Sequence, residues 1–210
     1  MTEEARQRRR TWVVGGILMA LAASVGFAAR FELAPYHAAK DVLWALAVLV
    51  LVVGLGRAGS ITRRRPFAST IVLLQVAMAA PPLPTFLSGL VPDDPGNLHA
   101  QEDAYLAVMI PYQALLFAVT VVAVILIGAV AALPRPWSWA PACVLALSVL
   151  SSTATLAIGF GGPSAVLQRV LYEVPGAGML LLGVIAIVLG IRAGTQPEFA
   201  ADPVARRVSP

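Results

Sequence analysis

Six long apolar stretches, separated by short polar segments, dominate the chain. They cover residues 11–29, 40–57, 67–90, 106–133, 140–160 and 174–191. A membrane-spanning helix needs about 20 predominantly apolar residues, because the hydrocarbon core is about 30 Å thick and a helix rises about 1.5 Å per residue. The pattern therefore predicts six membrane-spanning helices.

The apolar stretches have the pattern of helices and lack the alternation of barrel strands. Residues Phe117 to Leu133 are apolar almost throughout. Lipid offers no hydrogen-bond partner to a backbone group, so only a helix or a closed barrel can cross it. We predict an all-α integral membrane protein, a six-helix transmembrane bundle in residues 1–194, followed by a disordered cytoplasmic tail at residues 195–210.

Composition supports a single membrane domain. The chain has 210 residues, of which 59% are hydrophobic and 12% are charged; soluble domains have about 25% charged residues. The N-terminal apolar run is as long as a spanning helix, and Arg30, Phe31 and Glu32 follow it without a small-residue cleavage site, which favours a retained helix over a signal peptide. The single cysteine, Cys143, excludes an internal disulfide.

The basic residues predict the orientation, because short cytoplasmic loops are enriched in lysine and arginine. With the N-terminus inside, only Arg30, Lys40 and Arg169 fall on the outer side. Both termini are then cytoplasmic, in a multi-pass protein of the inner (plasma) membrane. Nucleic acid is not an expected partner, since the arginines lie between apolar runs instead of forming one stripe. Twelve arginines fall on the cytoplasmic side: Arg6, Arg8, Arg9, Arg10, Arg57, Arg63, Arg64, Arg65, Arg135, Arg192, Arg206 and Arg207.

Prolines predict local distortions of two spans. Pro81, Pro82 and Pro84 indicate a bend in the third helix, since each removes a backbone donor and crowds the preceding turn. Pro111 indicates a kink near the outer end of the fourth helix.

Acidic residues and histidines gather on the predicted outer side, and the densest segment is 91–105. Turn-forming residues there give way to a helix start near Asn97. Seven of the 11 acids and both histidines are on that side: Glu32, Asp41, Asp93, Asp94, Glu102, Asp103, Glu173, His37 and His99.

His99, Asp94 and Glu102 are the candidate catalytic residues. On a helix, His99 lies three and four residues from Glu102 and Asp103, so the three share one face. A histidine and a carboxylate can act as general acid and base or ligate a divalent cation. The alternative is a solvated first turn whose acids are stabilised by the helix dipole. A metal site would need further ligands from His37, Asp93, Asp94 or Glu173, and the sequence assigns no particular metal or cofactor.

A second group of polar residues near the same face predicts a ligand-binding site. Arg169, Tyr172 and Glu173 occur in the segment before the sixth helix, and Arg169 either binds a carboxylate or phosphate or pairs with a loop acid. Tyr112 and Gln113 either line the floor of a pocket or form hydrogen bonds between helices.

Two short motifs resemble the bacterial DUF998 family of small six-helix membrane proteins. One is Gly89-Leu-Val-Pro-Asp-Asp-Pro95 followed by His99, and the other is the segment from Gly162 to Arg169. The resemblance supplies no activity, but it implies that Asp94, His99 and Arg169 belong to one site on the outer face.

Two classes of function remain open. The first is a non-enzymatic membrane component that binds a lipid or small ligand, acts as a sensor or serves as an accessory subunit. The alternative is a membrane-embedded enzyme that acts on a lipid or isoprenoid-like substrate by acid/base or metal-assisted chemistry. A transporter is disfavoured, because no charge is predicted at mid-depth. The expected partners are the lipid bilayer, a lipid or apolar small molecule and another membrane protein.

Overall fold

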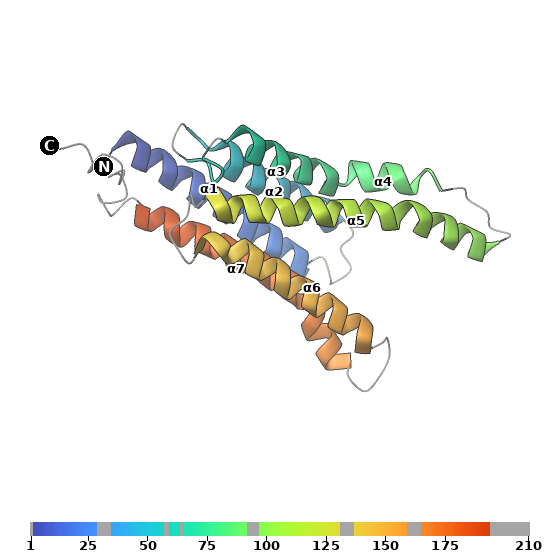
Figure 1. Cartoon of the computed structure of the whole chain (residues 1–210). Helices are drawn as coiled ribbons and strands as arrows, with labels where there is room; N and C mark the ends of the chain where they lie inside the picture. Colours follow the sequence, from blue (N-terminus) through green and yellow to red (C-terminus); the bar gives the residue numbers. More distant parts are fainter. Residues whose placement is uncertain are drawn as a thin grey trace.

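The structure is a computed structural model of the chain (Figure 1), and it describes residues 2–28, 35–56, 59–63, 65–91, 97–130, 137–158 and 165–193. All regular secondary structure in these ranges is helical, which confirms the predicted all-α class. The segments are α1 (Glu3–Ala28), α2 (Pro35–Val53), α3 (Pro66–Ala79), α4 (Pro82–Ser88), α5 (Leu98–Val130), η2 (Trp137–Trp139), α6 (Ala140–Ile158) and α7 (Ala165–Ala193).

Several of these helices are long and apolar enough to cross a bilayer. Among the described residues, 4 helices meet this condition, namely α1, α5, α6 together with η2, and α7. Helices α3 and α4 meet it as a pair bent by 49°, which makes up to 5 spans. By length and composition, the described part of the chain therefore has four or five helical segments able to cross a membrane.

Helix α1 packs antiparallel against α2, with glycines at the contact. A methyl group on Gly15 would lie 2.6 Å from the Leu51 side chain, and one on Gly26 would lie 3.1 Å from the Lys40 side chain. Small residues let helix backbones approach closely in lipid. The two contacts, near opposite ends of α2, show that α2 follows α1 over most of its length.

Helix α7 packs antiparallel against the other side of α1, and here the two backbones touch. A methyl group on Gly16 would lie 2.6 Å from the Gly183 carbonyl oxygen, and one on Gly190 would lie 3.0 Å from the Val13 side chain. The start of α1 and the end of α7 therefore lie at the same end of the bundle.

The connection from α2 to α3 folds back and closes the end of α2. Gly54 has φ +78°, a left-handed conformation typical of a residue that ends a helix. The last carbonyls of α2 would otherwise lack partners. The Ile61 amide donates to the Leu51 carbonyl at 2.8 Å, and the Ser60 hydroxyl donates to the Val52 carbonyl.

The predicted bend at Pro81, Pro82 and Pro84 is confirmed. Helix α3 ends at Ala79, and α4 begins at Pro82 in a new direction. The Pro82 nitrogen carries no hydrogen, so it cannot bond to the Met78 carbonyl as a continuous helix would require. Pro111 lies inside α5, which continues through it, and the kink predicted there stays a prediction.

Several predicted helix starts are wrong, because the helices extend beyond the apolar stretches. Helix α1 starts at Glu3 instead of residue 11, α2 at Pro35 instead of 40, and α7 at Ala165 instead of 174. Hydropathy identifies only the part of a helix that fits the lipid core. The proposed start near Asn97 is confirmed, since the Asn97 side chain accepts the Ala100 amide at 3.1 Å. The predicted tail at 195–210 lies outside the described residues.

The bundle spreads toward the end opposite the start of α1. Figure 1 shows α4 and the start of α5 reaching one tip, while α6 and the start of α7 reach another. Near the other end, α5 contacts η2, which directly precedes α6, since a methyl group on Gly128 would lie 2.9 Å from the Trp139 ring.

Candidate functional site

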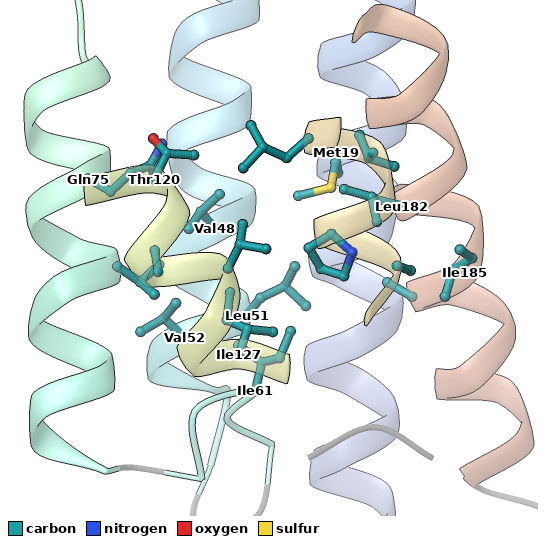
Figure 2. Close-up of a pocket in the computed structure, with 18 of the residues that line it drawn as sticks. Met19, Val48, Leu51, Val52, Ile61, Gln75, Thr120, Ile127, Leu182 and Ile185 are labelled. Carbon is teal, nitrogen blue, oxygen red and sulfur yellow. The ribbon is translucent and has the colours of Figure 1, made fainter. Parts of the chain in front are cut away.

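A cavity of about 280 Å³ lies in the middle of the bundle, and we call it the central cavity (Figure 2). Residues of α1, α2, α3, α5, α6 and α7 all contribute to its wall, which is predominantly apolar. The lining residues are Trp12, Met19, Trp44, Val48, Leu51, Val52, Ile61, Val72, Gln75, Thr120, Ala123, Val124, Ile127, Trp137, Ala140, Pro141, Val144, Leu145, Ser148, Leu182, Ile185 and Ala186.

Few polar groups reach the central cavity. The Thr120 hydroxyl donates to the Leu116 carbonyl and the Ser148 hydroxyl to the Val144 carbonyl, both at 2.8 Å and within their own helices. The side-chain amide of Gln75 makes no hydrogen bond within the described part of the chain. Figure 2 shows Gln75 and Thr120 together toward one end of the cavity, with Ile61 toward the other. The cavity therefore has an apolar body and one amide able to orient a ligand.

A second cavity, of about 580 Å³, lies between α1, α2, α6 and α7, and we call it the Lys40 cavity. It is nearer the spread end of the bundle and more polar, because Lys40, Ser152, Thr155 and Tyr172 line it. Its other lining residues are Ala22, Ala23, Gly26, Phe27, Leu156, Leu171, Pro175, Gly176 and Met179.

Two of the three candidate catalytic residues, His99 and Glu102, lie at the start of α5 and line neither cavity. His99 and Glu102 are exposed on the first turns of α5, as is Asp103, and Asp94 lies outside the described residues. No group of three or more histidine, cysteine, aspartate or glutamate side chains in the described ranges is placed to hold a metal ion. These positions match the alternative of a solvated helix start.

Tyr112 connects two helices instead of facing a cavity. Its hydroxyl donates to the Met78 carbonyl at 2.6 Å, which is the carbonyl that Pro82 leaves without its helical partner. A freed carbonyl inside a membrane needs such a partner from a neighbouring helix. The next residue, Gln113, is exposed and lines neither cavity.

The second predicted group lies on α7 and is only partly brought to a cavity. Tyr172 lines the Lys40 cavity, Glu173 is half-buried, and Arg169 is exposed one turn before them. The starts of α5 and α7 form the two separate tips in Figure 1, so the fold does not bring His99 and Arg169 together.

Neither cavity was predicted from the sequence, although the polar residues that line them can be recognised there. Gln75, Ser148, Ser152 and Thr155 stand out as polar residues within apolar stretches, and Lys40 is one of only three basic residues on the predicted outer side. Their grouping depends on how distant helices pack, and no spacing in the sequence specifies it.

No protein-family model matches the chain, and no curated protein or solved structure is similar enough to match it. The resemblance to the DUF998 family accordingly stays a prediction.

Proposed function

We propose that this protein crosses the inner (plasma) membrane six times, with both termini in the cytoplasm, and binds the apolar chain of a lipid or isoprenoid-like molecule in the central cavity.

Six crossings follow if α2 and the bent α3–α4 pair are added to the four long apolar helices. Helix α2 has 19 residues, and its stretch from Val42 to Val53 is apolar. It packs against α1 from Lys40 opposite Gly26 to Leu51 opposite Gly15. Because α2 lies beside α1 between these two contacts, we expect α2 to cross the membrane together with α1.

The arginines support the cytoplasmic placement of the end where α1 begins. That end includes the first turns of α1, the connection between α2 and α3, and the last turn of α7, where Arg192 lies. A methyl group on Gly59 would clash with the Thr11 side chain, so the connection is next to α1. Cytoplasmic ends of membrane bundles are enriched in arginine in this way.

Reporter fusions test the topology. We expect reporters fused after Ser60 and after Ala193 to read as cytoplasmic, and reporters fused after Val91 to read as external. A reporter that is active only outside the cytoplasm and one that is active only inside should give opposite results at each site. An external reading after Ala193 would overturn the six-crossing proposal.

The central cavity carries the binding part of the proposal. Water needs two to four polar partners to occupy a cavity, and this wall offers few. An empty cavity would forfeit the dispersion contacts of the residues around it. Ligand pockets measure about 300–1,000 Å³, so a cavity of about 280 Å³ is near the lower end and suits a single chain. Surrounding lipid supplies such chains at high concentration.

Filling the cavity tests the binding. Val124 lines the central cavity on α5 and is half-buried. We expect Val124→Phe to reduce retention of a hexadecyl chain by about tenfold, because the ring would occupy the space that the chain needs. The measurement is equilibrium binding of radiolabelled hexadecan-1-ol to protein in nanodiscs of zwitterionic lipid.

The matched control is Val122→Phe, the same substitution two residues earlier on an exposed part of α5. It should bind hexadecan-1-ol like wild type. Equal binding by both variants and wild type would show that the chain lies elsewhere and would contradict the proposal.

A further inference from the structure

The central cavity and the Lys40 cavity lie in line along the same three helices. On α7, Ala186 and Leu182 line the former, while Met179 and Tyr172 line the latter. Helices α1 and α6 contribute consecutive turns to the two cavities in the same order. From Ala186 to Tyr172 the helix rises about 21 Å, at about 1.5 Å per residue.

That length suits one lipid chain with its head group. One leaflet contributes about half of the hydrocarbon thickness, or roughly 15 Å. Two cavities that extend over about 21 Å along α7 therefore take a chain of leaflet length and leave room for a polar group at one end.

Two methionines stand where the cavities adjoin. Met19 lines the central cavity, Met179 lines the Lys40 cavity, and Met179 packs against the buried cluster that contains Met19. Methionine side chains are unbranched and flexible, so they adapt to a chain that passes between them.

The polar groups are concentrated at one end of this line. Lys40 is the one charged residue among the described residues that line either cavity. Its stem lies over Gly26, and its ammonium is 3.2 Å from Asp41. An ammonium has three donors, so Asp41 leaves two for a ligand. The hydroxyls of Ser152 and Thr155 belong to the same wall.

We propose that the ligand is a single-chain amphiphile with an anionic head group, whose chain occupies the central cavity and whose head group binds Lys40 in the Lys40 cavity. The inference rests on the proposed function, because it assigns the polar end of the same binding site. A carboxylate and a phosphate monoester share the required chemistry, a negative charge with acceptor oxygens.

Lys40 also has a purely structural alternative role. Cations are favoured near the C-terminal end of a helix, and Lys40 lies over the last turns of α1 at Gly26. In that role the lysine would stabilise the fold without affecting which ligand binds. The two roles therefore differ in ligand preference, which is what the experiment measures.

The experiment compares radiolabelled hexadecanoate with hexadecan-1-ol on the full-length protein in nanodiscs of zwitterionic lipid, at a pH where the carboxylate is ionised. Wild type should prefer the acid by about tenfold, since a charge-assisted hydrogen bond contributes roughly that much. Lys40→Met retains the apolar stem and removes the charge. The ratio of the affinity for hexadecanoate to that for hexadecan-1-ol should therefore fall close to one, while the affinity for hexadecan-1-ol stays unchanged. Lys40→Arg should retain the preference.

Acetate separates head-group binding from binding of the whole amphiphile. It carries the carboxylate without the chain and should not displace hexadecanoate. Displacement by equimolar acetate would overturn the inference, as it would show a small-anion site at Lys40.

The outcomes also separate this inference from the proposal on which it rests. An unchanged acid preference in Lys40→Met overturns the head-group assignment, while sensitivity of both probes to Val124→Phe keeps the central cavity as a chain site. Failure of both probes to bind wild type overturns both proposals. Unchanged hexadecan-1-ol binding by Lys40→Met shows that this variant folds.

Discussion

Replacing Gly183 by leucine should prevent the protein from folding into a stable bundle. A methyl group at this position would already lie 2.9 Å from the Gly16 carbonyl oxygen and 2.9 Å from the Ala20 amide nitrogen. Both neighbours are backbone atoms of α1, so no side chain can move aside. Overpacking of a well-packed core costs about 1–3 kcal/mol and sometimes more, and a contact between two backbones belongs at the upper end of that range.

The loss of stability should increase with the size of the side chain that replaces Gly183. Gly183→Ala should lower the apparent melting temperature in detergent, and Gly183→Leu should leave little monodisperse protein after size-exclusion chromatography. Helices in lipid associate through close packing, because lipid chains are as apolar as the side chains. The steric cost of a bulky group at this contact is therefore not offset by any gain from burying apolar surface.

Ala177→Leu is the matched control, because Ala177 is exposed on the same helix. It should behave like wild type in both measurements. A Gly183→Leu protein as stable as this control would show that α1 and α7 do not pack through Gly16 and Gly183.

The sequence predicted the parts of the fold that depend on local chemistry. The bend at Pro81 and Pro82 follows from a missing donor, and the helix start near Asn97 follows from a side chain that caps the first turn. The early start of α7 was missed, because Gln168 to Glu173 is polar enough to read as a loop although it forms a helix. Hydropathy does not distinguish a helix that leaves the lipid from a connection.

The candidate site could be predicted from the sequence less well than the fold. His99 and Glu102 were chosen because acid–base groups share a helix face, yet the fold places them exposed at a tip. The cavities instead combine residues such as Trp12, Val124 and Leu182, which are ordinary apolar residues in the sequence. Only the packing of several helices makes them neighbours, so the chemistry of the chain alone does not indicate a cavity.

After the contact at Gly183, the hydrogen bonds around Thr11 should be the feature of the fold whose loss by substitution lowers stability most. Thr11 is fully buried, and its hydroxyl accepts the Leu55 amide at 2.8 Å and donates to the Gln7 carbonyl at 3.0 Å. It thus ties α1 to the residues that follow α2. The neighbouring Trp12 indole donates to the Gly59 carbonyl at 3.0 Å and extends the same contact.

Thr11→Val keeps the shape of the side chain and removes the hydroxyl, so the Leu55 amide loses its partner. A fully buried donor left without a partner costs about 1–3 kcal/mol; because this hydrogen bond is partly buried, we expect a loss at the lower end of that range, measured by thermal unfolding in detergent. Thr153→Val is the matched control, because the Thr153 hydroxyl is exposed and bonds only to the Val149 carbonyl of its own helix. Equal stability of the two variants would contradict the role of Thr11. A loss of stability in Thr11→Val alone would place the junction of α1 and α2 among the contacts that hold the central cavity in shape.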